Sequence, residues 1–193
     1  FKAVDPILFS VLENIPNKHQ LTPKKSPDIF LDLIESVICQ QLSNKAGATI
    51  FERFRSLFPK KIITPNKVLA MPDEKIRRKG PSWSKVSYIK NIARAGDSGE
   101  LNLQTINAKS DEDVISVLTK IKGIGRWTAE MFLMFTLGRE DIFSYGDLGL
   151  RKAIMKLYGY KKEPTVKQME KLATRWKPYR TYAARILWKS LEL

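Results

Sequence analysis

Residues 118–138 read LTKIKGIGRWTAEMFLMFTLG, in which Gly123 and Gly125 stand immediately before a long apolar run with helical spacing. Glycine has no Cβ and tolerates positive φ, so the pair favours a tight turn that a ligand can approach closely. A helix begins with about four unpaired backbone N–H groups and a partial positive charge, which together favour anions. The stretch therefore predicts two helices joined by a phosphate-binding glycine turn, the second helix covering residues 126–137. An ordinary helix–turn–helix without a ligand is the alternative.

The residues around the turn support the phosphate interpretation. Arg126 follows the second glycine directly and offers a guanidinium that matches phosphate geometry. Backbone carbonyls on the entering side of such a turn can also hold a monovalent cation against the same phosphate.

Asp147 lies twenty residues after Trp127, in the segment FSYGDLGLRKA. An aspartate directly before an apolar-periodic run is among the best helix N-caps, which is a purely structural role. The helix dipole at that position also favours an ionised carboxylate, which suits a group that must stay negative beside a developing cation. The residues alone leave both interpretations open.

The composition excludes several classes of site. The chain has 193 residues, enough for one large domain or two closely joined lobes, and Cys39 is its only cysteine and His19 its only histidine. An internal disulfide, a four-cysteine iron–sulfur or zinc site, and a histidine-based triad are therefore impossible. No apolar run approaches the roughly 18 residues that a bilayer crossing needs, so we expect no membrane span.

The charge points to a polyanionic partner. Lys and Arg number 34 against 20 Asp and Glu, a formal net charge of +14, and they are spread along the chain. Nucleic acid is the natural partner, although a basic surface can also serve solubility or membrane contact.

Apolar residues recur with helical spacing along most of the chain, and we expect an all-α fold. Helix starts are predicted at residues 26–28, 43, 64–65, 82–84 and 110, and later helices at residues 126–137, 148–158, 165–176 and 179–191. Gly80, Gly96 and Gly138 are expected to end helices. Period-2 alternation is confined to residues 100–103, and the break between lobes is expected in the polar segment 96–110.

Seven aromatic residues are candidates for a site. They are Trp83, Trp127, Tyr145, Trp176, Tyr179, Tyr182 and Trp188. Most are expected to be core or packing residues, and a minority to line a binding pocket.

Four motifs together resemble a known family. They are IKGIGRWTA followed by GDLGL, VICQQLSNKAG at residues 37–47, GPSWSKVSYIKNIA at 80–93 and WKPYRTYAARILW at 176–188. Their order and spacing are similar to those of the helix-hairpin-helix (HhH-GPD) DNA glycosylases, and within them to the alkylation-repair branch of the 3-methyladenine DNA glycosylase II type. The resemblance covers about residues 28–190.

The resemblance implies an all-α, two-lobed fold with the active cleft between the lobes. We expect a single HhH-GPD domain over residues 1–193, with one lobe at about 26–105 and the other, which carries the hairpin and the catalytic aspartate, at about 106–193. Residues 1–25 are expected to return and pack on the second lobe.

The resemblance also assigns site residues. Asp147 matches the catalytic aspartate, and Trp127, Trp188 and Tyr145 are assigned to the pocket for the extruded base. The residues expected to contact DNA are Gln41, Leu42, Ser43, Lys85, Gly123, Gly125, Arg126 and Thr128. Either Gln41 or Leu42, with Leu42 preferred, fills the gap in the duplex. The carbonyls of Thr119, Ile121 and Gly123 match those that hold a Na⁺ or K⁺ ion.

The expected reaction is hydrolysis of an N-glycosidic bond, which leaves an abasic site in double-stranded DNA. The expected substrates are alkylated purines such as 3-methyladenine and 7-methylguanine, with ethenoadenine and hypoxanthine as further candidates. Relatives that also cleave the backbone carry lysine at the position of Trp127, so we expect a monofunctional enzyme. No cofactor and no iron–sulfur cluster is expected. The alternatives are another lesion class, such as deaminated or mismatched pyrimidines or 8-oxoguanine, and a non-catalytic protein that binds damaged DNA.

Two departures from the family pattern stand out. Pro81 occupies a place where the family has an aliphatic residue, which puts the role of the loop after Gly80 in question. The extra N-terminal β-rich domain of some longer members is absent from the sequence, which suggests a compact version of the enzyme. We expect an intracellular monomer, in the cytoplasm or nucleoid of a prokaryote or the nucleus of a eukaryote.

Overall fold

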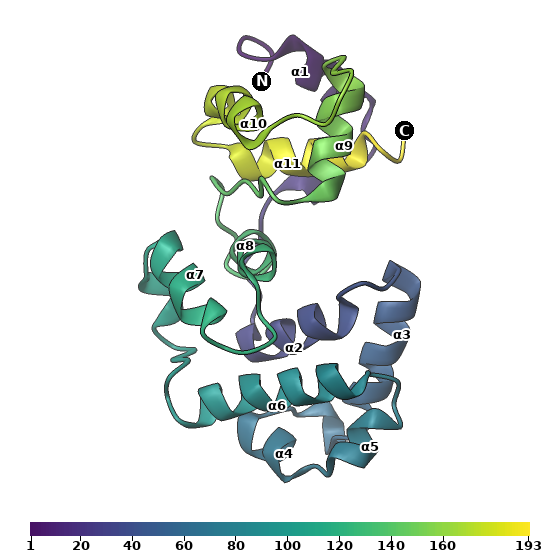
Figure 1. Ribbon diagram of the computed structural model, residues 1–193, viewed down its shortest axis with the longest axis vertical. Helices are drawn as coiled ribbons and strands as arrows, with labels where there is room; N and C mark the ends of the chain where they lie inside the picture. Colours follow the sequence, from purple (N-terminus) through teal and green to yellow (C-terminus); the bar gives the residue numbers. More distant parts are fainter. The chain divides into compact units, whose positions relative to one another are not determined.

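The structure is a computed structural model that describes residues 1–193, apart from the side chain of Asn44. Within the described part the regular secondary structure is helical, with no β-strand, and residues 100–103 lie in a loop of bends and a turn (Figure 1). The predicted all-α fold class is therefore confirmed. Contacts between residues divide the chain into two compact units, one of residues 26–132 and one of residues 1–25 with 133–193.

Residues 26–132 form a layered helical unit. Its helices are α2 (Ile29–Cys39), α3 (Asn44–Arg55), α4 (Pro65–Ala70), α5 (Asp73–Arg77), α6 (Trp83–Asp97), α7 (Asp111–Thr119) and most of α8 (Arg126–Phe135). Helix α6 packs against α2, α4 and α5, and α2 also packs against α3. The apolar face of α2 is fully buried, with Leu33, Ile34, Val37 and Ile38 at its centre.

Side-chain caps set the starts of these helices. Ser43, Thr64, Ser82 and Ser110 each accept a hydrogen bond from a backbone N–H of the first turn, as their positions predict. The start near residues 26–28 needs one correction. Asp28 and not Ser26 caps α2, because the Asp28 carboxylate reaches the N–H of Leu31 while Ser26 accepts from Asp28 itself.

The predicted end of a helix at Gly96 is wrong. Helix α6 continues through Gly96 to Asp97, and Gly99 provides the left-handed residue, with φ of 79°, that follows the helix. Gly96 serves packing instead, since a Cβ there would come within 3.1 Å of Pro65 on α4.

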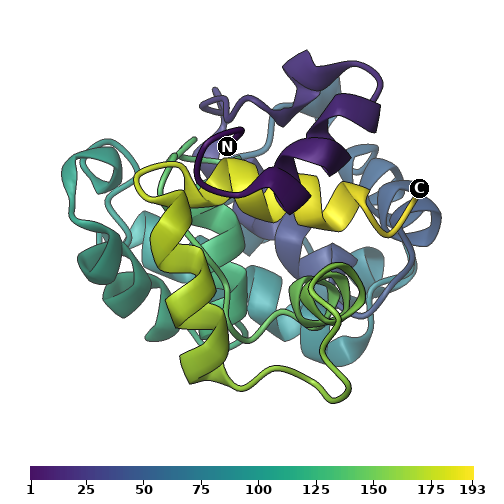
Figure 2. The ribbon, with the colours of Figure 1, turned by 90° about the horizontal axis from the view of Figure 1, so that it is seen from above.

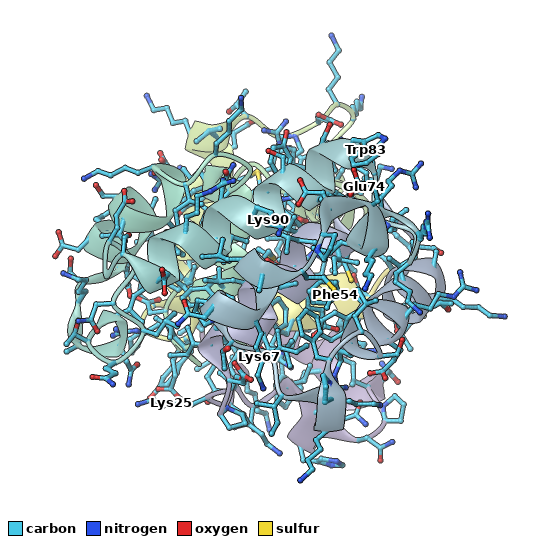
Figure 3. All side chains as sticks on the ribbon, turned by 90° about the horizontal axis from the view of Figure 1, so that it is seen from below. Lys25, Phe54, Lys67, Glu74, Trp83 and Lys90 are labelled. Atoms are coloured by element: carbon cyan, nitrogen blue, oxygen red, sulfur yellow. The ribbon has the colours of Figure 1, made fainter. Side chains whose placement is uncertain are left out.

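Lys90 lies on the face of α6 that packs against α4 (Figure 3). Its ammonium group donates to the carbonyls of Leu69 and Met71 at the end of α4, and it pairs with Asp73 over 3.2 Å. These bonds satisfy a buried charge and fasten α4 to α6.

Residues 1–25 and 133–193 form the second unit. It contains α1 (Pro6–Asn14), the end of α8, α9 (Leu148–Leu157), α10 (Val166–Ala173) and α11 (Arg180–Lys189). Helix α11 packs against α9 and α1, and Figure 2 shows the purple α1 beside the yellow α11. The predicted helix 165–176 is divided into α10 and a 3₁₀ turn at Thr174–Trp176.

A buried carboxylate ties the N-terminal segment to this unit. Asp5 is 2% exposed, and its Oδ2 accepts from the Tyr158 hydroxyl over 2.7 Å and from Trp176 Nε1 over 2.8 Å. Its Oδ1 caps α1 through the N–H of Leu8. The sequence contains no local signal for this contact, since Asp5 and Trp176 are 171 positions apart.

The units divide between residues 132 and 133, inside α8, and not near residue 105 as the sequence analysis expects. The hairpin belongs to the unit of residues 26–132 because it is bonded to α2 and α6 of that unit. Asn91 on α6 donates to the carbonyl of Lys122, and Gln40 at the end of α2 donates to the carbonyl of Gly123. Gly138, with φ of 65°, ends α8 as expected.

Candidate functional site

Asp147 occupies the N-cap of α9. Its Oδ1 accepts the N–H of Leu150 over 2.8 Å, and the residue is only 8% exposed. The unpaired backbone N–H groups of the first turn and the helix dipole favour the negative charge of the carboxylate. The capping role and a catalytic role are therefore compatible, because a fixed anion is what both require.

Trp188 contacts the same carboxylate oxygen from α11. Its Nε1 donates to Asp147 Oδ1 over 2.9 Å. Gly149 makes this approach possible, since a Cβ at that position would lie 3.0 Å from Asp147 Oδ1 and 3.0 Å from the indole. The resemblance predicts that Trp188 lines the pocket for the extruded base, and the structure shows a further role that the sequence did not predict, the donation of a hydrogen bond to Asp147.

Two further residues beside Trp188 were not predicted. The ring of Phe135, at the end of α8, lies 5.8 Å from that of Trp188, and it is 45% exposed. The guanidinium of Arg185 lies over Phe135 at 5.0 Å and donates to the carbonyl of Gln20 over 2.8 Å. Burial lowers the pKa of Arg185. Arg185 and Trp188 are three residues apart and therefore lie on one face of the helix. This spacing is the sequence signal from which Arg185 could have been predicted as a neighbour of the site.

The loop that leads to Asp147 is held by the start of α11. Arg180 forms a bidentate pair with Asp141, at 2.6 Å and 3.0 Å, and this hydrogen bonding raises its pKa. The Thr181 hydroxyl donates to the carbonyl of Arg139 and accepts the N–H of Ile142. These bonds fix residues 139–142, and only four residues separate this held segment from Asp147.

Tyr145 is half-buried and packs against Phe143, with ring centroids 5.2 Å apart. Phe143 in turn packs against Trp176, which is buried. The carbonyl of Tyr145 accepts from Arg151 over 3.2 Å. These contacts place Tyr145 at the edge of an aromatic cluster, and its contact with a base stays a prediction.

The hairpin belongs to the unit of residues 26–132. Gly123 has φ of 111°, and a Cβ there would collide with the ring of Tyr88. Gly125 is exposed and has open space around it. The two glycines therefore differ in purpose, since Gly123 is required by the fold and Gly125 leaves the start of α8 accessible.

Three predicted residues follow the glycines on α8. Arg126 pairs with Glu130 over 3.0 Å and with Glu112 over 3.1 Å, and the hydrogen bond to Glu112 raises its pKa. Trp127 is 43% exposed, whereas Thr128 is buried. The Thr128 hydroxyl accepts from Gln40, so any part that it plays in DNA binding is indirect. A phosphate at Arg126 would compete with Glu112 for the guanidinium.

The other predicted DNA-binding residues lie in the turn between α2 and α3, apart from Lys85, which is on α6. Gln41 has φ of 57°, and Leu42 is 38% exposed. Ser43 caps α3. Lys85 is half-buried, and its ammonium donates to the carbonyls of Ile38 and Gln40 at the end of α2. Burial lowers the pKa of Lys85. The observed role of Lys85 is to cap α2, and its contact with DNA stays a prediction.

The loop with the unusual proline is well packed. Pro81 is buried and directly precedes the N-cap Ser82. Gly80 has φ of 121°, and a Cβ there would come within 3.0 Å of the Ile50 side chain on α3. Proline fits here because a fixed φ and a missing N–H are tolerated just before a helix.

Within the described residues, no group of three or more His, Cys, Asp or Glu side chains could hold a metal ion. The predicted cation ligands are backbone carbonyls. The carbonyl of Ile121 accepts the N–H of Ile124 over 3.0 Å, and that of Gly123 accepts from Gln40 over 3.1 Å. Each carbonyl has two lone pairs, so these bonds leave one acceptor site on each oxygen. None of the helices in the described part is long and apolar enough to cross a membrane.

Comparisons with known proteins agree on one family. Residues 34–178 match the model of the HhH-GPD superfamily base excision DNA repair protein. DNA-3-methyladenine glycosylase 1 of Schizosaccharomyces pombe is 39% identical over 176 residues, which cover 88% of this chain and 75% of that protein.

Solved structures give the same result. The DNA-3-methyladenine glycosidase of Bacillus halodurans has a TM-score of 0.82 and 36% identity, over 97% of this chain and 85% of that one. The 3-methyladenine DNA glycosylase of Schizosaccharomyces pombe, in complex with abasic DNA, has a TM-score of 0.80 and 33% identity, over 98% of each chain.

Proposed function

This chain belongs to the HhH-GPD superfamily of base excision DNA repair proteins, and we propose that it is a monofunctional DNA glycosylase for alkylated purines. Its expected substrates are 3-methyladenine and 7-methylguanine, with ethenoadenine and hypoxanthine as further candidates. The names of its relatives support this class of substrate. The observation that carries the catalytic part is the carboxylate of Asp147, held by the N–H groups of Leu150 and Trp188.

Cleavage of the N-glycosidic bond develops positive charge on the deoxyribose, as in other reactions with an oxocarbenium-like transition state. Asp147 is the group that stabilises this charge and orients or deprotonates the attacking water. Because Asp147 is buried, little water screens its charge, and its electrostatic stabilisation of a nearby cation is stronger than at the protein surface. The two N–H donors keep it in place without reorganisation during the reaction.

The leaving group explains the preference for alkylated purines. Purines alkylated at N3 or N7 carry a positive charge and leave as neutral bases, so the enzyme needs no strong general acid. An exposed indole such as Trp127 would stack on such a ring with a cation–π contribution of about 0.5 to 2 kcal/mol, which a neutral base lacks. The tryptophan at this position also supplies no amine for a Schiff base, which is why backbone cleavage is not expected.

Contact with DNA is proposed for the two exposed turns of the unit 26–132. At the hairpin, the N–H groups that start α8 bind a phosphate beside Gly125, with Arg126 as a second donor. The carbonyls of Thr119, Ile121 and Gly123 would hold a Na⁺ or K⁺ ion, for which neutral oxygens are suitable ligands. At the other turn, Gln41 or Leu42 fills the gap that the extruded nucleotide leaves.

A glycosylase assay on a panel of duplexes tests the proposal. Each duplex carries one lesion, among them 7-methylguanine, ethenoadenine, hypoxanthine, uracil and 8-oxoguanine, and Asp147→Asn is the control. We expect base release from the alkylated purines, with strand breaks only after alkali treatment. Release of uracil or 8-oxoguanine alone would change the substrate class. Tight binding without any base release would identify a non-catalytic protein that binds damaged DNA.

A further inference from the structure

One side-chain amide joins the two turns that face DNA in the proposed function. Gln40 Nε2 donates to the carbonyl of Gly123 over 3.1 Å and to the hydroxyl of Thr128 over 3.2 Å. Gly123 is 83 positions away in the sequence. Both donors of the amide are therefore used, one on each side of the start of α8.

The main chain at Gln40 is held from a different direction. Lys85 on α6 donates to the carbonyl of Gln40 over 2.6 Å and to that of Ile38 over 2.7 Å. These are carbonyls at the C-terminus of α2, where a cation satisfies both the missing hydrogen bonds and the helix dipole. Gln40 is thus fixed through its backbone to α6 and through its side chain to the hairpin.

One face of α6 contacts both turns. Lys85, Tyr88 and Asn91 follow one another at intervals of three residues and so lie on the same side of the helix. Lys85 bonds the turn between α2 and α3, Tyr88 packs under Gly123, and Asn91 donates to the carbonyl of Lys122 over 3.0 Å. Helix α6 is therefore a common support for the hairpin and the turn.

The residue after Gln40 is held in an uncommon conformation. Gln41 has φ of 57°, a left-handed value that residues other than glycine seldom adopt. Such a conformation persists only where the surrounding structure determines it. Leu42, which follows it, is exposed. The bonds to Gln40 therefore define the direction in which Gln41 and Leu42 project.

We propose that Gln40 is a positioning residue that keeps the tip of the turn, Gln41 and Leu42, in register with the hairpin while DNA is bound. Binding of a phosphate at the hairpin then also places the tip at the lesion. The tip does not have to find its position in the duplex in a separate step before the base is extruded. This inference rests on the proposed glycosylase function.

The inference separates two measurable properties. Affinity for an undamaged duplex depends on the hairpin and on basic residues, and the Gln40 side chain is not expected to contribute to it. Extrusion of a paired lesion depends on the position of the tip. Loss of Gln40 should therefore reduce extrusion and the rate on a paired lesion, and leave affinity for undamaged DNA nearly unchanged.

The test compares Gln40→Ala and Gln40→Glu with wild type and with Gln104→Ala, an exposed glutamine of the same unit. Gln40→Glu keeps the shape of the side chain and loses its two N–H donors. Extrusion is followed by the fluorescence of 2-aminopurine placed beside the lesion, and affinity by anisotropy of a labelled undamaged duplex. The melting temperature of each variant is recorded in parallel.

For both Gln40 variants we expect single-turnover excision of a paired lesion to fall by about tenfold or more, with a matching loss of fluorescence. When the same lesion stands opposite an abasic analogue, no base pair must be broken. The excision rate of the variants should then fall by only about threefold or less. Affinity for undamaged duplex should stay within about twofold. Gln104→Ala should match wild type.

A double variant with Thr128→Val shows whether Gln40 acts through the hairpin. If it does, Gln40→Ala with Thr128→Val should be no slower than Gln40→Ala alone. The inference is overturned if the Gln40 variants extrude the base as wild type does. It is also overturned if the excision rate on the paired lesion, the excision rate on the unpaired lesion and the affinity for undamaged DNA all fall by the same factor. Failure of wild type to release any base would instead reject the glycosylase function.

Discussion

Trp188 donates its indole N–H to the carboxylate of Asp147 over 2.9 Å, although 41 positions separate the two residues. The same oxygen accepts the N–H of Leu150, so a helix start and a second helix fix one carboxylate together. Gly149 leaves the space that this arrangement needs. The first three predictions concern this group.

Asp147→Asn should abolish base release, a loss of at least about 1,000-fold in single-turnover rate, because the charge acts mainly in the transition state. Asparagine is also a good N-cap, so the melting temperature should stay close to that of wild type. Affinity for lesion DNA should remain within about tenfold. A substantial residual rate would reject the mechanism.

Trp188→Phe should lower the rate by about tenfold on every lesion, since a hydrogen bond to a charged group contributes about 1.5 to 3 kcal/mol. Trp188→Ala removes the ring as well. If the ring stacks on the base, this variant should lower the excision rate more on cationic 7-methylguanine than on neutral hypoxanthine. Rates on the two lesions are compared for both variants. Full activity of Trp188→Phe would show that the hydrogen bond has no catalytic role.

Gly149→Ala should reduce activity without loss of stability. The added methyl group would lie 3.0 Å from Asp147 Oδ1 and from the indole, and so displace one of them. A displacement of about 1 Å can cost on the order of 100-fold in rate, while alanine in a helix is more favourable than glycine by about 0.5 to 1 kcal/mol. Gly146→Ala is the matched control, because Gly146 has open space around it. Equal activity of the two variants would contradict the steric argument.

Gly125→Ala and Gly123→Ala should differ in kind. Gly125 has open space, so its variant should fold normally and bind undamaged and damaged duplexes more weakly by a similar factor. Gly123→Ala would place a methyl group against Tyr88 at a φ of 111°, and should cost about 1 to 3 kcal/mol of unfolding free energy. Duplex affinity and urea unfolding separate the two. Unchanged affinity of Gly125→Ala would show that the hairpin does not anchor DNA.

Asp5→Ala should destabilise the protein by about 3 kcal/mol, because the Tyr158 hydroxyl and the Trp176 N–H lose their buried partner. Tyr158→Phe removes one of these bonds and leaves no orphan hydroxyl, so it should cost only about 1 kcal/mol. Urea unfolding measures both. Activity well below the melting temperature should be unchanged, and a selective loss of base excision in Asp5→Ala would assign it a role beyond stability.

Much of the fold could be read from the sequence because the relevant signals are local. An N-cap such as Ser110 bonds a backbone N–H three residues away, and the apolar face of α2 repeats with helical spacing. The error at Gly96 arose because a local rule was overridden by a tertiary contact. The sequence predicts that Gly96 ends a helix, but Gly96 lies inside α6, where a Cβ would come within 3.1 Å of Pro65 on α4.

The sequence by itself determined the helical class, the glycine hairpin, the cap at Asp147 and the family, because each depends on residues within a few positions or on the order of motifs. The tertiary structure alone decided that Trp188 donates to Asp147, that Gln40 bonds the hairpin and that Asp5 joins Trp176. These partners are 41, 83 and 171 positions apart, respectively. No periodicity or spacing encodes such a pair, because its geometry exists only once several helices have packed together.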